Sequence, residues 1–174
     1  MYKRQIKERY KKQWSGVFYD RYILGLWTVA EGIIYDMFDK ARNVVDEARN
    51  LTQTRYISCD YGTQNAMVFL LWEKGIDGIW YCTKEYYYSG RDKKKQKTDS
   101  EYADDLVEFI GDKKIKQIVV DPSAASFITE LKKRKFSVKK AKNDVANGIR
   151  EVATTLNQNL SLIHISEPTR LQLI

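Results

Sequence analysis

The order of strand and helix patterns between residues 55 and 156 constrains the fold of this chain more than any other feature. Three strand patterns come first, at residues 55–60, 65–73 and 78–88, and the glycines of "KGIDG" supply the turn between the last two. Helix and strand patterns then alternate along the chain. A meander followed by alternation predicts an α/β fold, with a mixed β-sheet flanked by helices.

The alternating part begins with a helix whose two ends are both marked in the sequence. Thr98 and Glu101 have the spacing of a capping box, and Gly111 is the residue type that ends many helices. The strand pattern that follows, Ile118–Val120, consists of consecutive β-branched residues. Such a run is typical of a strand that is buried on both faces of a parallel or mixed sheet.

The remaining patterns are two further helices separated by a short strand in "FSVKKA". We expect Ser123 to cap the first of these helices, because it follows Pro122 and precedes an apolar helical stripe. Asn143 is expected to cap the second helix. In that helix, apolar residues from Val145 to Leu156 recur at steps of four, three and four.

The sequence shows no sign of membrane insertion or export. No apolar run approaches the roughly 18 residues that a membrane span requires, and no apolar segment follows the basic N-terminus. Cys59 and Cys82 both lie within strand patterns. This position favours buried thiols in a reducing cytosol over a disulfide.

Positive charge is clustered in two segments. The 174 residues carry a net charge of +7, and the clusters are "RDKKKQK" at 91–97 and "KKRKFSVKK" at 132–140. Such runs are often no more than a solvated surface, but basic side chains also neutralise phosphates and release counterions. A nucleic-acid-binding surface would use Arg91, Lys93, Lys94, Lys95, Lys97, Lys139 and Lys140.

Aromatic residues are dense in the third strand pattern, "WYCTKEYYY" at residues 80–88. Because successive side chains point to opposite faces of a strand, half of these aromatics should face helices in the core. The outward half would either cover the sheet or contact nucleobases.

Two aspartates each come at the end of an apolar strand pattern: Asp60 ends the first pattern, and Asp121 follows Val120. Ligands of open α/β sheets collect beyond the carboxyl ends of the strands. If these strands are adjacent and parallel, both carboxylates lie at one edge and would bind Mg²⁺ or Mn²⁺. Two such ions, about 3.5–4 Å apart, activate water and stabilise the leaving oxygen of a phosphodiester. Alternatively, Asp60 opens a turn with Gly62, and Asp121 caps the helix after Pro122.

Four segments resemble, in the same order, one viral protein family. They are "GVFYDRYILGLWTVAEGIIYDMFD", "CDYGTQN", "VVDPSAASFITEL" and "VKKAKNDVANGIREV", and the family is the large terminase subunit of tailed bacteriophages and prophages, in its PBSX-like branch. The element order, with an acid after the first and the fourth strand, is also similar to the ribonuclease H-like nuclease fold. The resemblance extends over residues 2–159. It implies the nuclease domain of a DNA-packaging motor, which cuts concatemeric viral DNA at initiation and termination of headful packaging.

The resemblance also implies roles for individual residues. Asp60 matches the first metal-binding acid and Asp121 the second, with two Mg²⁺ or Mn²⁺ ions in the intact family site. Asp144, in the matching segment "KNDVANGIR", either contacts a metal-bound water or caps the helix. The implied substrate is double-stranded DNA. The implied partners are the terminase small subunit and the portal protein, in the cytoplasm of a bacterial host.

The resemblance divides the chain at residues 53 and 160. Residues 1–53, which show one short helical pattern and otherwise no sustained period, resemble the end of the family's ATPase domain and a linker, and form an irregular lead-in. Residues 54–160 resemble an incomplete nuclease domain, and residues 161–174 are expected not to be a native terminus. No G-x-x-x-x-G-K-[ST] phosphate loop occurs, and the family's third metal-binding acid is not matched.

We therefore expect a truncated nuclease domain that binds metal weakly and cleaves DNA poorly. One alternative is a non-catalytic fragment that binds DNA or docks on the motor. Another is a different ribonuclease H-like nuclease, such as a resolvase.

Overall fold

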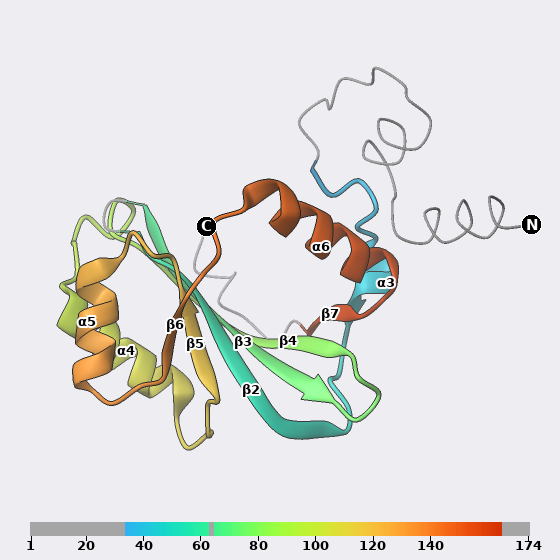
Figure 1. Ribbon diagram of the computed structural model, residues 1–174, viewed down its shortest axis with the longest axis horizontal. Coiled ribbons are helices and arrows are strands. Elements are labelled where there is room, and N and C mark those ends of the chain that lie inside the picture. Colours follow the sequence, from blue (N-terminus) through green and yellow to red (C-terminus); the bar gives the residue numbers. More distant parts are fainter. Residues whose placement is uncertain (1–33, 63–64, 165–174) are drawn as a thin grey trace, which may run out of the picture. The chain divides into compact units, whose positions relative to one another are not determined.

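The computed structural model describes residues 34–62 and 65–164 (Figure 1). The short N-terminal helix and most of the expected lead-in lie outside these residues. The described chain forms two compact units. Asp46–Asn143 make up the body of the larger unit, and Asp144–Leu162, with the described residues before Asp46, make up the smaller one. No helix among the described residues has the length and apolar character of a membrane span.

The larger unit is built on a mixed sheet, as the sequence predicted. The strands within Asp46–Asn143 are β2 (Leu51–Asp60), β3 (Ala66–Gly75), β4 (Trp80–Ser89), β5 (Gln117–Val120) and β6 (Val138–Lys140). They lie in the order β4-β3-β2-β5-β6 (Figure 1). β3 is antiparallel to both β2 and β4, whereas β5 is parallel to both β2 and β6. Consequently, β4 runs in the same direction as β2.

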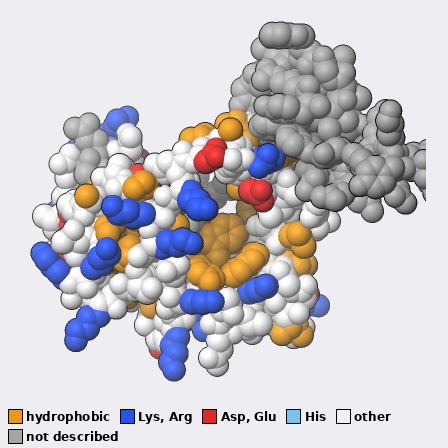
Figure 2. Space-filling model, viewed as in Figure 1, with side chains coloured by type: hydrophobic (Ala, Val, Ile, Leu, Met, Phe, Trp, Pro, Cys, Tyr) orange, Lys and Arg blue, Asp and Glu red, His pale blue; other side chains and the backbone are white. Residues whose placement is uncertain are grey.

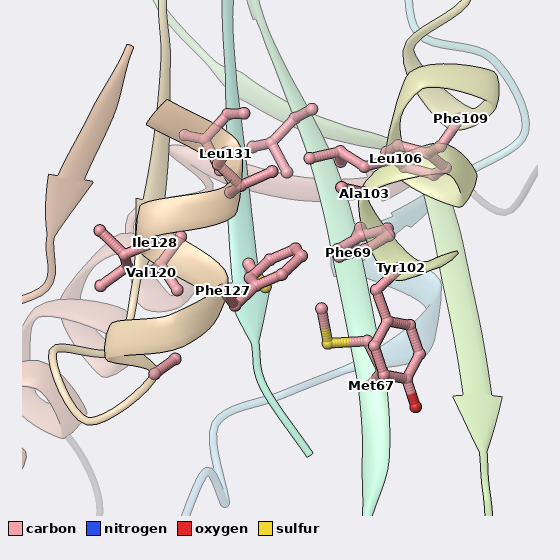
Figure 3. Close-up of a cluster of buried hydrophobic side chains, with 14 of the residues drawn as sticks. Met67, Phe69, Tyr102, Ala103, Leu106, Phe109, Val120, Phe127, Ile128 and Leu131 are labelled. Atoms are coloured by element: carbon pink, nitrogen blue, oxygen red, sulfur yellow. The ribbon is translucent and has the colours of Figure 1, made fainter. Parts of the chain in front are cut away.

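Two helices pack on one face of this sheet, α4 (Asp99–Ile110) and α5 (Ala125–Lys133). The core between sheet and helices is apolar and aromatic. Phe69 of β3 packs against Phe109 of α4 and Phe127 of α5 (Figure 3). Burial alternates along β3, where every second residue from Met67 to Gly75 is buried. The residues between them belong to the opposite face of the sheet.

The predicted limits of α4 are confirmed. Thr98 and Glu101 form the reciprocal capping box, with N–H to oxygen distances of 3.2 and 2.8 Å. Gly111 follows the helix with a φ of 59°, a conformation that glycine adopts without strain. The predicted cap of α5 is wrong. Ser123 lies one residue before the cap position, because its hydroxyl donates to Asp121 instead.

The described part of the smaller unit contains α3 (Lys40–Asn43), β1 (Val44–Val45) and α6 (Val145–Asn157). The cap of α6 is Asp144, and the prediction that Asn143 caps it is wrong. Asn143 lies too early, since the side chain that accepts an N–H of the first turn is that of Asp144. Buried Asn43 donates to the carbonyl oxygen of Leu156 at 3.1 Å, which links α3 to the end of α6.

Only some of the apolar residues that form the helical pattern of α6 are buried. Leu156 is buried, but Val145 is 71% exposed and Val152 is 42% exposed. The pattern therefore predicted the helix correctly but not the residues that it buries. After α6 comes β7 (Ser161–His164), so the segment expected to be a non-native terminus begins with a strand, and the rest of it lies outside the described residues.

Cys59 and Cys82 are both free and buried, as predicted. Burial raises the pKa of each thiol to about 12, assisted by the charge of Asp60 near Cys59 and of Glu85 near Cys82. A thiol with such a pKa is not a nucleophile at neutral pH. Both cysteines therefore serve as apolar core residues.

Candidate metal centre

Asp60 and Asp121 lie at the carboxyl ends of two neighbouring parallel strands, β2 and β5. The register of these strands pairs Cys59 with Val120. Each aspartate directly follows one member of this pair, so the two aspartates lie at the same level of the sheet. Backbones of neighbouring strands are about 4.8 Å apart. The strands are thus adjacent and parallel, which is the condition that the sequence left open.

Asp60 belongs to the face of the sheet opposite α4 and α5, which we call the acid face, and Asp121 directly follows β5 at the same edge. Cys59 and Val120 are buried in the core beneath the helices, and consecutive side chains of a strand point to opposite faces. Asp60 is exposed and Asp121 is partly exposed. The pair is accessible to a hydrated cation from the side of the sheet that α4 and α5 do not cover.

Three donors hold the Asp121 carboxylate. The backbone N–H and the hydroxyl of Ser123 donate to Oδ1 at 2.7 and 2.5 Å, and Nδ2 of Asn143 donates to Oδ2 at 3.1 Å. The bonds from Ser123, and then the bond from Asn143, hold the pKa of Asp121 below its ordinary value. The carboxylate is therefore ionised and oriented at neutral pH. The N–H that Asp121 accepts is that of Ser123, which lies before the cap position of α5. Asp121 therefore forms a turn before this helix and does not cap it.

The residue after Asp60 fixes the end of β2. The hydroxyl of Tyr61 donates to Oδ1 of Asp99 at 2.5 Å, and its ring stacks on that of Phe127 with centroids 5.4 Å apart. Burial, followed by the hydrogen bond to Asp99, raises the pKa of Tyr61 to about 12. Asp99 belongs to α4 and Phe127 to α5. Both helices therefore anchor the backbone beside Asp60.

A close backbone approach follows at Gly62. A Cβ atom at this position would lie 2.5 Å from the carbonyl oxygen of Ala66, which no side chain tolerates. The connection after β2 thus requires glycine, and the alternative that Asp60 opens a turn stays a prediction. Such a turn would not involve the Asp60 carboxylate, however. No donor among residues 34–62 and 65–164 contacts its carboxylate, which leaves the oxygens available as ligands.

The donor chemistry of the two carboxylates suits one hard divalent cation. Mg²⁺ in proteins is usually bound through one or two carboxylates, with water and substrate phosphates completing its coordination. Oδ2 of Asp121 accepts one hydrogen bond and keeps a lone pair for a metal. No group of three or more His, Cys, Asp or Glu side chains suited to a metal occurs in the described part of the chain. Two ions at this centre stay a prediction.

Asp144 caps α6, which is one of the two roles considered for it. Its Oδ1 accepts the N–H of Asn147 at 3.1 Å, and its Oδ2 accepts a bond from the side-chain amide of Asn147. These two bonds hold the pKa of Asp144 below its ordinary value. Asp144 belongs to the smaller unit, whereas Asp60 and Asp121 belong to the larger one. Its contact with a metal-bound water stays a prediction.

The basic segment after β4 is folded onto α4. Nζ of Lys97 lies 2.5 Å from Oδ2 of Asp105 and 4.5 Å from the ring centroid of Tyr88. Lys95 and Glu101 form a more exposed pair at 3.9 Å. Lys97 therefore holds the segment in place, and its predicted binding of a phosphate would compete with this ion pair. The other predicted DNA contacts of the segment are exposed: Arg91, Lys93 and Lys94.

These cations share one edge of the sheet with the aspartates. Because β4 runs parallel to β2, the segment that follows β4 lies at the same edge as Asp60. Lys139 and Lys140, the remaining predicted DNA contacts, are exposed residues of β6, which neighbours β5. Figure 2 shows Lys and Arg side chains spread over the face that it displays, with fewer Asp and Glu side chains. DNA binding by these cations stays a prediction.

Sequence reasoning missed Ser123 and Asn143 as partners of Asp121. For Ser123 a local signal existed, because an aspartate two residues before a backbone N–H is typical of an Asx turn. For Asn143 the sequence carries no such signal. Its contact with Asp121 arises only because β6 lies beside β5.

No protein-family model and no curated protein matches the sequence. Among solved structures, the chain is similar to the large terminase of a thermophilic bacteriophage, solved in complex with ADP. The identity is 54% and the TM-score 0.86, over 92% of this chain and 40% of that protein. The chain thus spans about two fifths of the length of that relative.

Two more distant structures have the same fold. The nuclease domain of the P22 large terminase is 13% identical with a TM-score of 0.58, over 79% of this chain and 74% of that domain. The HK97 bacteriophage large terminase is 11% identical with a TM-score of 0.56, over 72% of this chain and 32% of that protein. The predicted ribonuclease H-like fold, a mixed sheet with flanking helices, is confirmed by this likeness.

Proposed function

The chain belongs to the bacteriophage large terminase family and covers part of its nuclease domain, and on this premise we propose that it is a metal-dependent DNA endonuclease. One observation carries the proposal: Asp60 and Asp121 lie at the same level on adjacent parallel strands, at the edge where such sheets bind ligands. The accessible acid face and the net charge of +7 support a polyanionic substrate.

The residues of the larger unit have separate tasks in the proposed reaction. Asp60 and Asp121 would hold Mg²⁺ or Mn²⁺. When bound, the ion supplies Lewis acidity, which makes water a better nucleophile and offsets charge on the phosphodiester. Ser123 and Asn143 hold the Asp121 carboxylate ionised and in one orientation, in which it would serve as a ligand. Tyr61 keeps the end of β2, and hence Asp60, in a fixed position.

We take the substrate, the number of ions, the partners and the location from the resemblance to the large terminase family. The substrate would be concatemeric double-stranded viral DNA, and cleavage would follow a two-metal-ion mechanism. The partners would be the terminase small subunit and the portal protein, in the cytoplasm of a bacterial host. The two carboxylates support the first of the two ions, and a second would need ligands beyond those found in the described residues.

A second candidate function is DNA binding without cleavage, by a fragment that docks on the motor. The observation that favours it is the same lack of a third acidic or histidine ligand in the part of the chain that the structure describes. The two candidates differ in their need for metal. A nuclease site needs the divalent ion to act on the phosphate, whereas a binding module retains DNA equally well in EDTA.

Nicking of supercoiled plasmid in Mn²⁺ or Mg²⁺ tests the proposal. Asp60→Asn and Asp121→Asn remove one charge each without changing side-chain size, and both should abolish any nicking. Asp112→Asn makes the same change at an exposed carboxylate in the turn after α4 and should have no effect. Nicking that persists in both site variants would exclude this metal centre. No nicking by the parent chain, combined with EDTA-insensitive DNA binding, would favour the second candidate.

A further inference from the structure

Lys139 and Lys140 are neighbours in sequence but lie on opposite faces of the sheet. The register pairs Lys139 with Val119 and Lys140 with Val120. Val120 is fully buried in the core under the helices, so its partner in β6 belongs to the helix face. By alternation, Lys139 belongs to the acid face. Both lysines are exposed, so they differ in the face of the sheet to which they belong and not in solvent accessibility.

At the other side of the sheet, Tyr87 belongs to the same row as Asp60. Asp60 pairs with Val68, and Val68 pairs with Tyr87. Directly paired residues share a face, so Tyr87 lies on the acid face, two strand spacings or about 10 Å from Asp60. The neighbouring Tyr86 points to the helix face, where its hydroxyl donates to Asp105. Tyr87 itself is 42% exposed.

The segment beyond Tyr87 adds ordered positive charge. Within it, the N–H of Lys93 donates to the carbonyl oxygen of Ser89 at 3.0 Å, and the N–H of Lys95 donates to that of Gly90 at 3.1 Å. The hydroxyl of Tyr88 donates to the carbonyl oxygen of Lys95 at 2.8 Å. The backbone is thus held in one turn at the edge that carries the aspartates. This turn needs no large rearrangement to present its cations to a polyanion.

We propose that double-stranded DNA lies across the strand ends on the acid face, contacting Tyr87 on one side of the aspartates and Lys139 on the other. From β4 to β6 is four strand spacings, about 19 Å, which corresponds to about five or six base pairs of duplex. The Lys139 ammonium and the Tyr87 hydroxyl both suit phosphate oxygens, which position a duplex without reading its sequence. The point of cleavage between them rests on the proposed function, but the binding path does not.

The experiment measures duplex binding without metal. Fluorescence anisotropy of a short labelled duplex in EDTA, over a series of salt concentrations, gives the slope of log K against log salt. Lys139→Gln should make this slope less steep by about 0.9, since one phosphate contact is lost. The proposed path excludes Lys140 from the predicted DNA contacts, so the matched control Lys140→Gln should leave the slope unchanged. Tyr87→Phe should lower affinity at every salt concentration without changing the slope, because it removes a hydrogen bond but no charge.

The outcomes separate this inference from the nuclease proposal. Equal effects of Lys139→Gln and Lys140→Gln, or no effect of either, would overturn the path across the acid face. A change confined to Lys139→Gln, together with the loss of affinity in Tyr87→Phe, would support it even if the chain never nicks plasmid. Thermal unfolding followed by circular dichroism confirms that each variant is folded, as expected for changes at exposed side chains.

Discussion

Asn143 donates its side-chain N–H to Oδ2 of Asp121 at 3.1 Å, although the two residues are 22 positions apart in the sequence. Asn143 lies beyond the end of β6, and Asp121 lies beyond the end of β5. The parallel pairing of these strands brings them together. Since Ser123 holds the other oxygen, the direction of this carboxylate depends on contacts from both sides.

Removal of the Asn143 amide should weaken metal binding without removing a ligand. In Asn143→Ala, Oδ2 of Asp121 loses its only hydrogen-bond donor among the described residues, and the carboxylate gains rotational freedom. Loss of such an outer partner typically costs about 10- to 100-fold in metal affinity. Calorimetric titration with Mn²⁺ in the absence of DNA measures the change directly.

Asn147 provides the matched control for this prediction. Asn147→Ala also removes an amide from an aspartate, but from Asp144, the cap of α6. If Asp144 acts only as a cap, Mn²⁺ affinity should be unchanged in this variant. Equal affinities in the parent chain and Asn143→Ala would show that the hydrogen bond does not orient a metal ligand.

Two kinds of lysine should occur in the segment after β4: some contact DNA, and Lys97 stabilises the fold through its ion pair with Asp105. Replacement of Lys93 and Lys94 by Gln should make the salt dependence of duplex binding less steep by up to about 1.8, or 0.9 for each phosphate contact. Lys97→Gln should leave the slope unchanged. It should instead lower the free energy of unfolding by about 1–2 kcal/mol, because Asp105 loses a charged hydrogen-bond donor in a site that is 21% exposed.

Anisotropy and urea unfolding, on the double Lys93→Gln, Lys94→Gln variant and on Lys97→Gln, check both parts of this prediction. Lys114→Gln, at an exposed lysine beyond α4, controls for a change of net charge alone. A less steep slope in Lys97→Gln would return this residue to the set of DNA contacts. The ion pair with Asp105 would then have to open when DNA binds.

The sequence predicted the mixed sheet and the features that depend on neighbouring residues, but it did not predict the strand register or the contacts that follow from it. The capping box of Thr98 and Glu101 is a local signal, and the structure contains it. The position of Asp60 and Asp121 at strand ends was also visible, because apolar patterns end at both. The register that places them at one level was not, since a shift by one residue would turn one side chain to the other face.

The different roles of the basic residues also depend on contacts that are distant in sequence. Composition alone treats Lys97, Lys139 and Lys140 as equivalent cations. Their differences arise from an ion pair with Asp105 and from the pairing of β6 with β5. Ser123 and Asn143 were assigned as caps because both residue types favour helix starts. Each instead holds Asp121, a partner outside the helix in question.

Glu73 of β3 should be the most sensitive ionic position of the larger unit. It is 1% exposed and contacts Nε of Arg55 at 2.5 Å and Nζ of Lys113 at 3.0 Å. Glu73→Ala would leave both cations without this acceptor. The expected loss in the free energy of unfolding is about 3 kcal/mol. Glu85→Ala, at an exposed position of β4, should change it by no more than about 0.5 kcal/mol. Urea unfolding at neutral pH measures both, and similar values would contradict the structural role of the cluster.

The same residue should make stability fall in acid. Burial raises the pKa of Glu73, but hydrogen bonds from Thr83, Arg55 and Lys113 outweigh it and hold the pKa below the ordinary value of 4.5. Well above pH 4.5 the carboxylate is ionised in both states, and its stabilising contribution is complete. As the pH falls below 4.5, the unfolded chain binds the proton first, so stability is lost until the folded pKa is passed.

Glu73→Gln isolates this contribution from that of the other carboxylates. The variant should be less stable than the parent at neutral pH, and the difference should shrink as the pH falls below 4.5. Glu85→Gln, which removes an exposed carboxylate from β4, should follow the parent curve throughout. Urea unfolding at a series of pH values provides the three curves. Parallel curves for the parent and Glu73→Gln would mean that Glu73 has the same pKa folded and unfolded, and that the contacts with Arg55 and Lys113 add no net preference for its charged form.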